Sequence, residues 1–537
     1  MEQRIDFHRV AREYDAALRF NQGVKLYDTV QTNENFFIGK QWEGVQSNGL
    51  PTPVFNFLKR VVLFSVANIA MDNLKLHAKP LSSNGQIPTA VLEVYSSILN
   101  DQFSALFERN QMGGLIRSFC RNAAVDGDGC LFTWWDADAE TGQDSRGMPR
   151  TEVLQNTQVM FGNPNNRDVQ SQPYIILERR MLVDQCKRYA RSHGHADTDA
   201  ITADDKDSGD AEMDQLGGEK VTVLLRLWKD EESGTVHCYE CTRKAELRST
   251  WDLGISLYPL VWMPWDYIQD CYHGQAMITG LIPNQIFVNK LFAMSMISLM
   301  TLAYPKVVYD RTRVSKWSAR VGAAIGVNGS VEGVAKIIDP ASISPQISQF
   351  IDVAVGYTQK FLGATDVALG DSRPDNASAI IALQRAAATP MELTKQNLLQ
   401  CIEQQGRIYA AFMAEYYGKR FVEVKLPGDQ GSTVVQFDFS ILNQVPCAID
   451  LDAGASSYWS EIANMQTLDN LLIQGKISTS EYLRRLPAGQ ISDREALIAV
   501  TEAAEQAEST PLSGNGAGYG AVQRNIRQTG KLARKEV

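Results

Sequence analysis

"NQIFVNKLFAMSMISLMTLA", residues 284–303, and "QISQFIDVAVGYTQKFL", residues 346–362, are two apolar stretches with helical periodicity. At 1.5 Å rise per residue they predict helices of roughly 30 Å and 26 Å, so the two are matched in length. The first is apolar around more of its circumference than one antiparallel neighbour could cover. The same hairpin of a second copy could cover the rest, because a head-to-tail contact that closes makes a ring. A core hairpin within a monomer explains the periodicity equally well.

The segments next to these helices have a different character. Residues 304–345 predict a small module of strand, short helix or turn, Gly-rich loop and strand, with an exit bounded by prolines. The stretch "FLGATDVALGDSRPDNASAIIALQRAAATP", residues 361–390, begins with a polar loop in which Asp and Pro disfavour helix, and Asn376 is a suitable N-cap for a third helix. This third helix is expected to run as far as about Tyr417, with a kink at Pro390.

The remaining chain predicts a mixed α+β fold in which helices dominate. Residues 1–80 predict helices interrupted by a loop that starts at Asn33, and one helix is expected over about 90–125. Period-two patterns then predict strands from residue 129 to 264 and again from 421 to 454. A helical region comes next, and after about 508 the composition turns to Gly, Ser and Asn with a basic end, which predicts a flexible tail.

Composition and charge limit the function. The 537 residues carry a formal net charge of −10 and a pI of about 5.3. Such an acidic surface argues against a protein that binds DNA phosphates tightly. A channel through which DNA slides needs only weak binding, so this function stays open. The longest apolar run, 291–304, is shorter than the roughly 20 residues that cross a bilayer. We expect no membrane segment.

Metal and calcium sites have weak support. Eight cysteines without framework spacing indicate a reducing compartment, and Cys238 and Cys241 in "HCYEC" fit a strand better than a zinc site. The acidic segment 193–218 fails as a calcium loop because Asp210 and Leu216 stand where Gly and Glu are needed. It is predicted to be an exposed linker, and no cofactor is expected.

Enzymatic alternatives can also be weighed from the residues. No Gly-Lys pair is followed by Ser or Thr, so the phosphate-binding loop of a motor ATPase is absent from the sequence. A metal-dependent nuclease could be assembled from clustered carboxylates, namely Asp126, Asp128, Asp136 and Asp138. Turns at the two ends of a strand explain these aspartates more simply.

Several motifs, taken in their order, resemble the bacteriophage portal protein family of tailed double-stranded DNA viruses. They are "FFIGKQW" (36–42), "DGDGCLFTWWD" (126–136), "VMFGNPNNRDVQSQPYII" (159–176), "YHGQAMITGLIPNQIFVNK" (272–290), "GDSRPDNASAIIALQ" (370–384) and "LIQGKISTSEYLRRLP" (472–487). Each is weak alone, and the resemblance runs from about residue 30 to 505.

The resemblance implies a ring, usually of twelve subunits, at one vertex of the capsid. It divides the chain into a wing (1–275), two stem helices (276–303 and 346–363) that flank a clip (304–345), a tunnel loop (364–376), a kinked long helix with wing strands (377–454), a crown (455–508) and a flexible tail (509–537). Its partners would be further copies of the chain, DNA in the channel, the terminase motor, the major capsid protein, head-to-tail adaptors and, as a further option, a scaffold protein. Assembly would take place in the bacterial cytoplasm.

Residue roles carry over by position. The tunnel loop residues are Asp371, Ser372, Arg373, Asp375 and Asn376; the clip residues that would dock motor or adaptor are Arg311, Arg313, Lys316, Trp317 and Arg320; and the stem packing residues are Phe292, Met296, Met300, Ile351 and Val355. A solvated surface explains the clip charges equally well. Another virion structural protein, such as a shell protein or a tail adaptor, is the alternative to a portal, although it has no use for matched helices with an inserted module.

Overall fold

The computed structural model describes residues 5–47, 49–70, 74–80, 89–143, 145–195, 198–204, 219–303, 307–318, 320, 324–337, 346–361, 391–425, 432–443, 447–452, 468–486, 497–498 and 500–501. The chain divides into two compact units, Met1–Gly454 and Ala455–Val537. In the second unit, helix α13 (Thr479–Arg485) is capped by the side chain of Ser478. The first unit mixes helices and sheets, which confirms the predicted α+β class.

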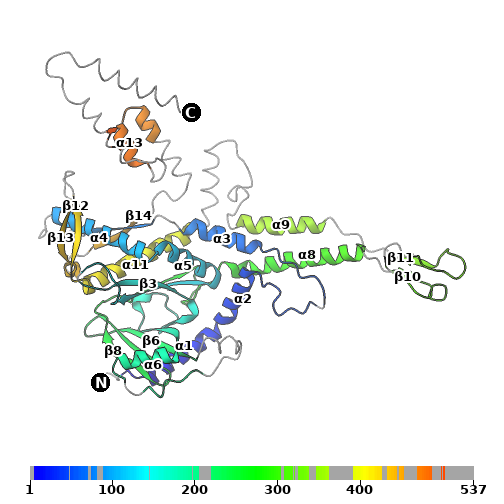
Figure 1. Ribbon diagram of the computed structural model, residues 1–537, viewed down its shortest axis with the longest axis horizontal. Helices are drawn as coiled ribbons and strands as arrows, with labels where there is room; N and C mark the ends of the chain where they lie inside the picture. The colour runs from blue at the N-terminus through cyan, green and yellow to red at the C-terminus, as the bar shows by residue number, and fades with distance from the viewer. Residues whose placement is uncertain are drawn as a thin grey trace, which may run out of the picture. The chain divides into compact units, whose positions relative to one another are not determined.

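A five-stranded antiparallel sheet forms one layer of the first unit. Its strands pair in chain order, β4 (Val159–Phe161), β5 (Ile175–Leu182), β6 (Lys220–Lys229), β7 (Val236–Thr242) and β8 (Glu246–Asp252). Alternation along β6 points Leu224 to the face covered by helix α1 (Phe7–Gly23). Val221 and Val223 point to the opposite face, part of which helix α6 (Val183–Ser192) covers (Figure 1).

A three-stranded sheet forms the next layer. Its central strand β2 (Asp128–Asp136) lies between β3 (Met148–Leu154) and β9 (Leu260–Pro264). Cys130 and Phe132 on β2 pack toward the five-stranded sheet, while Leu131 faces the helical core. Both faces of β2 are therefore buried, which explains the nearly continuous apolar run "CLFTWW".

The helical core lies against the other face of the three-stranded sheet. Its helices are α2 (Leu26–Ile38), α3 (Phe57–Ile69), α4 (Thr89–Arg109), α5 (Met112–Asp126) and α11 (Glu392–Tyr416). Two ribbons border it, β1 (Lys75–Pro80) with β14 (Cys447–Asp452), and β12 (Lys419–Lys425) with β13 (Ser432–Asp438). Short 3₁₀ turns are η1 (Asn156–Gln158), η2 (Val169–Ser171), η3 (Ile278–Gly280) and η5 (Phe439–Asn443).

Two local predictions are wrong. The single helix expected over 90–125 is two helices, because Gln111 takes a left-handed conformation with φ of 51° and breaks the hydrogen-bond ladder. Asn110 at the break donates to the carbonyl oxygens of Leu106 and Pro149, so the turn is held by its own side chain. The loop expected from Asn33 starts later, because α2 continues to Ile38.

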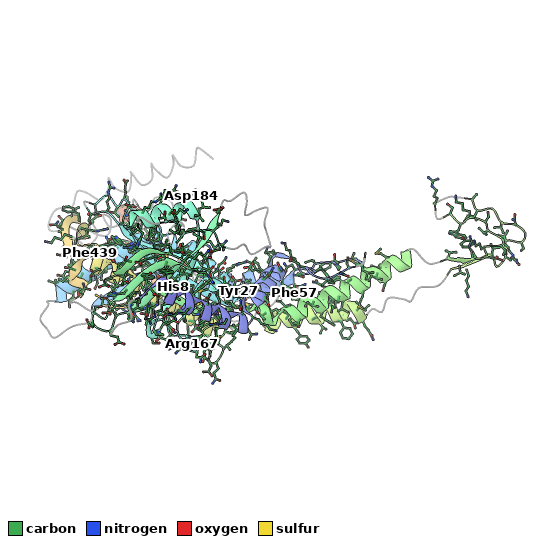
Figure 2. All side chains as sticks on the ribbon, turned by 90° about the horizontal axis from the view of Figure 1, so that it is seen from below. His8, Tyr27, Phe57, Arg167, Asp184 and Phe439 are labelled. Atoms are coloured by element: carbon green, nitrogen blue, oxygen red, sulfur yellow. The ribbon has the colours of Figure 1, made fainter. Side chains whose placement is uncertain are left out.

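The two long apolar helices are present as predicted, as α8 (Ile282–Ala303) and α9 (Gln346–Phe361). They lie side by side in both views (Figures 1 and 2). Between them in the chain, β10 (Val307–Tyr309) and β11 (Ala335–Ile337) form a two-stranded antiparallel sheet. Among the helices of the described ranges, none combines the length and the apolar content that a bilayer crossing needs.

Candidate functional site

Helices α8 and α9 pack as an antiparallel pair. Asn284 near the start of α8 donates from Nδ2 to Thr358 Oγ1 near the end of α9, at 3.0 Å. Thr358 is buried and also donates to the carbonyl oxygen of Ala354 within its own helix. This polar contact fixes the register of two otherwise apolar surfaces.

A chain of buried amides attaches α8 to the helical core. Gln285 donates from Nε2 to Asn289 Oδ1 (2.9 Å) and to the carbonyl oxygen of Phe55 (2.8 Å), and Asn289 donates from Nδ2 to Gln41 Oε1 (2.6 Å). All three amides are buried. Phe292, one turn further along, stacks on Phe55 with ring centroids 3.9 Å apart. The motifs "FFIGKQW" and "NQIFVNK" therefore meet at this attachment.

Beyond the attachment, α8 and α9 expose large apolar side chains. On α8 these include Met296, 40% exposed, and Met300, 54% exposed, and on α9 they include Phe350 and Val353. The other predicted stem packing residues, Phe292, Ile351 and Val355, are partly buried. The pair of helices thus leaves an uncovered apolar surface, called here the stem surface and defined by Met294, Met296, Leu299, Met300, Phe350 and Val353. Met296, Leu299 and Met300 fall on one side of α8 at helical spacing, and a cluster of exposed apolar side chains of this kind marks an interaction site.

The module between the two helices has a small core of its own. Val314 and Val334 are buried in it, and the backbone N–H of Asp310 donates to the carbonyl oxygen of Val334 at 2.9 Å. Trp317 stacks on Tyr309 with ring centroids 5.4 Å apart. The expected order of strand, turn, loop and strand is confirmed.

The same module carries exposed positive charge. Arg313 lies 3.5 Å from Asp310, whereas Arg311, Lys316 and Arg320 are exposed and have no acidic partner among the described residues. With Lys336, the described part of the module holds five cations against two carboxylates, in a chain whose net charge is −10. Four of the five predicted clip residues, the three unpaired cations and Arg313, therefore form a local basic surface.

The predicted tunnel loop lies outside the described residues. This applies to Asp371, Ser372, Arg373, Asp375 and Asn376, and also to Pro390 and the kink expected there. Helix α11 begins at Glu392 and ends at Tyr416, close to the predicted end of the third helix.

A buried contact between an aspartate and a histidine joins two motifs of the sequence. His273 Nδ1 lies 2.8 Å from Asp128 Oδ2, and the backbone N–H of Gly274 donates to Asp128 Oδ1 at 2.7 Å. Asn156 donates a third hydrogen bond to the same carboxylate at 3.3 Å. Burial raises the pKa of Asp128, while the hydrogen bond and the charge of His273 oppose this rise. These hydrogen bonds stabilise the Asp128 carboxylate in a site from which water is excluded.

Glycine is required where these motifs touch. A Cβ on Gly127, which has φ of 108°, would lie 2.7 Å from the carbonyl oxygen of Gly274. A Cβ on Gly274 would lie 2.8 Å from the carbonyl oxygen of Asp266, which is also backbone. Neither neighbour can rotate away, so "DGDG" and "YHGQ" use glycine for close approach.

The aspartates of the nuclease alternative do not form one site. Asp128 begins β2 and Asp136 ends it, which separates them by about 26 Å at 3.3 Å per residue. Asp128 is bound by His273, and Asp136 lies 3.4 Å from Arg150. Within the described ranges, no group of three or more His, Cys, Asp or Glu side chains is placed to hold a metal ion.

Asp126 is expected to make stability fall as pH rises. Its carboxylate lies 3.6 Å from Arg121, and its Oδ1 is buried without a hydrogen-bond partner among the described residues. Burial and the neighbouring Glu34 carboxylate raise the pKa of Asp126. When folding raises the pKa of an acid, its contribution to the free energy of unfolding is fully present below the unfolded-state pKa. That contribution is lost as the pH rises through the folded-state pKa.

Replacing Asp126 by asparagine should remove this slope. Between about pH 5 and about pH 8, the melting temperature of Asp126→Asn should rise relative to that of the unmodified chain. Thermal unfolding at several pH values measures this difference. The exposed Asp138→Asn serves as the control and should leave the slope unchanged. Parallel pH profiles for the chain and Asp126→Asn would contradict the assignment.

The cysteines of the described residues are buried or partly buried, and none of them forms a disulfide. Cys238 and Cys241 lie in β7, as the sequence predicted, and they pack into different clusters. Burial raises the pKa of every one of the eight thiols, for example that of Cys120 to about 12. Of the acidic segment 193–218, residues 196–197 and 205–218 lie outside the described ranges.

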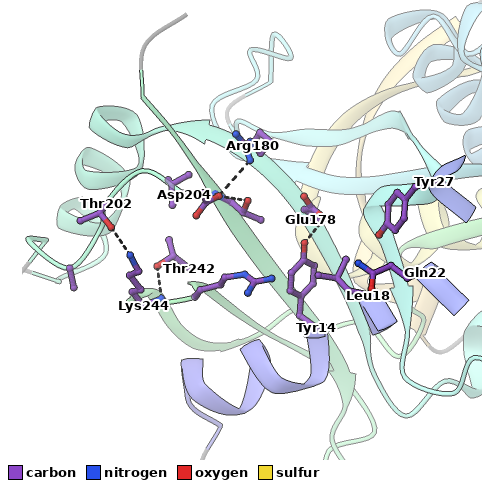
Figure 3. Close-up of a pocket in the computed structure, with 14 residues that line it drawn as sticks. Tyr14, Leu18, Gln22, Tyr27, Glu178, Arg180, Thr202, Asp204, Thr242 and Lys244 are labelled. Atoms are coloured by element: carbon purple, nitrogen blue, oxygen red, sulfur yellow. Dashed lines mark hydrogen bonds and ion pairs between the residues drawn. The ribbon is translucent and has the colours of Figure 1, made fainter. Parts of the chain in front are cut away.

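A groove of about 610 Å³ lies between α1, α2 and the five-stranded sheet (Figure 3). Its charged side chains have partners, in the pairs Glu178–Tyr14, Arg180–Asp204, Arg243–Asp15 and Lys244–Thr202. Because each of these charged groups already has a hydrogen-bond or ion-pair partner, the groove shows no group that requires a ligand. The hydrogen bond between Tyr14 and Glu178 holds α1 against the sheet, and we assign no catalytic or binding role to the groove.

Sequence reasoning missed the buried polar residues. The sequence motifs contain Gln285, Asn289 and His273 but do not predict their buried hydrogen bonds. Polar residues inside apolar runs are the signal that could have indicated such a network. Gln41 gives no such signal, because its surroundings in the sequence are polar.

Comparison with known proteins addresses the resemblance directly. Residues 212–454 match the family model described as "Phage P22-like portal protein". None of the curated proteins matches the chain. The matched residues include α8, the basic module, α9 and α11. This match confirms the resemblance to the bacteriophage portal protein family over residues 212–454.

Proposed function

We propose that this chain is one subunit of a portal ring at a capsid vertex, and that double-stranded DNA is packaged and ejected through the channel of the ring. The observation that carries this proposal is the stem surface. An isolated chain would leave these apolar side chains in water, and a neighbouring copy of the same hairpin offers a complementary surface. The match of residues 212–454 to the portal family model supports a virion protein with a structural role.

The remaining regions take their roles from this arrangement. In the proposal, α8 and α9 are the stem, the basic module is the clip, and residues 364–376 face the channel as the tunnel loop. Asp371, Arg373 and Asp375 would give each subunit a mixed-charge contact with DNA, and oppositely charged neighbours weaken one another's pull on a phosphate. Weak contacts repeated around a ring let the duplex move, which agrees with the acidic net charge.

Electron microscopy of the purified protein, viewed end-on, tests the ring. Native mass should be measured on the same sample across a concentration series. We expect closed rings, twelve subunits being the usual number in the family, with an open channel of roughly 20 Å or more, the width of a duplex. Monomers at every concentration, with and without a scaffold protein, would overturn the proposal, whereas flat lattices would favour a shell protein.

The clip is proposed to dock the packaging motor or an adaptor through its cations. Changing both Arg311 and Lys316 to glutamate should weaken binding of the terminase motor at least about tenfold at low salt, since reversed charges repel an acidic partner. The rings themselves should form normally. Binding is measured by surface plasmon resonance at two salt concentrations.

The control for this experiment is Arg188→Glu, which reverses an exposed charge on α6. It should leave motor binding unchanged. Equal losses for the control and the clip variant would mean that overall charge decides binding and that the clip is a solvated surface.

A further inference from the structure

Arg420 is a buried cation without a counter-charge. Only 5% of the residue is exposed, and no acidic side chain of the described residues lies within ion-pair distance of its guanidinium group. Its hydrogen bonds go to two carbonyl oxygens, those of Gly147 (2.8 Å) and Tyr417 (3.4 Å). The guanidinium carbon also lies 3.7 Å from the centre of the Tyr417 ring. These contacts satisfy some donors but leave the charge uncompensated, which is costly for a buried group.

A second arginine stands at the same pocket. Arg109, in the last turn of α4, is exposed, has no acidic partner among the described residues, and lines with Arg420 a cavity of about 110 Å³. Burial lowers the pKa of Arg420, and the charge of Arg109 lowers it further. Two guanidinium groups thus repel one another across a small cavity, where an anion between them would relieve the repulsion.

The rest of the cavity wall has an apolar part, formed by Ala105, Leu106, Met148 and Phe421, and a polar part that is held in place. Gln143 donates from Nε2 to the carbonyl oxygen of Phe421 (3.0 Å) and accepts from the Phe421 N–H (2.9 Å), so the loop before β3 is fastened to β12. Gln102 of α4 and Thr141 complete the polar wall. A water-sized site needs about 10–15 Å³ on this measure, so 110 Å³ holds several waters or one tetrahedral oxyanion.

We propose that the pocket between α4, the loop before β3 and the start of β12 binds a phosphate group between Arg109 and Arg420. Guanidinium groups bind tetrahedral oxyanions through paired, charge-assisted hydrogen bonds. The source is either free inorganic phosphate or a backbone phosphate of nucleic acid. The site does not depend on ring formation, so its test stands apart from that of the portal channel.

Titration of the full chain with inorganic phosphate, followed by ³¹P NMR line broadening, tests the site. Sodium chloride at equal ionic strength is the reference. We expect saturable binding that Arg109→Gln weakens about tenfold, the loss of one charge-assisted pair. Arg146→Gln is the matched control, because Arg146 is exposed in the same loop region but does not line the cavity. Since Arg109 is exposed, its replacement should leave the fold intact, which circular dichroism checks.

Two further arms distinguish the sources and the alternatives. Displacement of phosphate by a short DNA duplex would assign the pocket to backbone phosphate, and failure of the duplex to compete would assign it to the free ion. No saturable binding, or binding that Arg109→Gln leaves unchanged, would overturn the proposal.

Discussion

Replacement of Met296 by lysine is expected to leave each chain folded and to abolish ring formation. Met296 belongs to the stem surface and is already 40% exposed, so a lysine there disturbs little in the single chain. In the ring the same position would be buried against a neighbour, and an unpaired buried ammonium group costs several kcal/mol. Because every subunit contributes one such interface, the penalty is repeated around the ring. Native mass and end-on micrographs measure the outcome.

Two variants control this experiment. Met296→Leu keeps an apolar side chain of similar volume and should still form rings. Leu182→Lys introduces the same charge on β5, at a residue that is 41% exposed, and should also form rings. Rings of Met296→Lys would show that α8 is not packed between subunits, and the stem surface would then need another partner.

Replacement of Asp128 by alanine should destabilise the chain by about 3–5 kcal/mol, the range measured for breaking buried ion pairs. The change leaves His273, the Gly274 N–H and the Asn156 amide without their common acceptor. It also creates a cavity between β2 and the segment that leads into η3 and α8. Urea or thermal unfolding of the unassembled chain measures the loss.

Asp136→Ala is the matched control, since it removes the same side chain from the other end of the same strand. Asp136 is partly exposed and its pair with Arg150, at 3.4 Å, is near the surface, so the expected loss is below about 1 kcal/mol. Similar losses for the two variants would show that the buried pair contributes no more than a surface contact.

The sequence predicted the elements with strong periodicity and missed those that depend on distant residues. Helices α8 and α9 follow from uninterrupted apolar patterns, and β2 and β6 from runs of β-formers. The break at Gln111 precedes Gly113 and Gly114, but both glycines lie inside α5, and the side chain of the preceding asparagine stabilises the break itself.

The polar contacts of the site show a second limit. Asp128 and His273 are 145 residues apart, and nothing in "DGDG" alone indicates that an imidazole will neutralise it. The same holds for Arg420, whose neighbour Arg109 comes from a helix more than 300 residues earlier. Pattern reasoning finds which face of an element is apolar, but partners for buried charge are set by tertiary packing.

The low reactivity of the eight thiols would protect the proposed assembly from disulfide cross-linking. A thiol reacts with oxidants and forms disulfides as the thiolate, and a raised pKa together with poor access keeps that form scarce at neutral pH. A particle that leaves its host passes from a reducing interior into oxidising surroundings. Subunits held close together in a ring would be cross-linked at random if reactive thiols faced outward. In the proposed particle, the low reactivity of the buried and partly buried thiols would let the same covalent structure persist inside and outside the host cell.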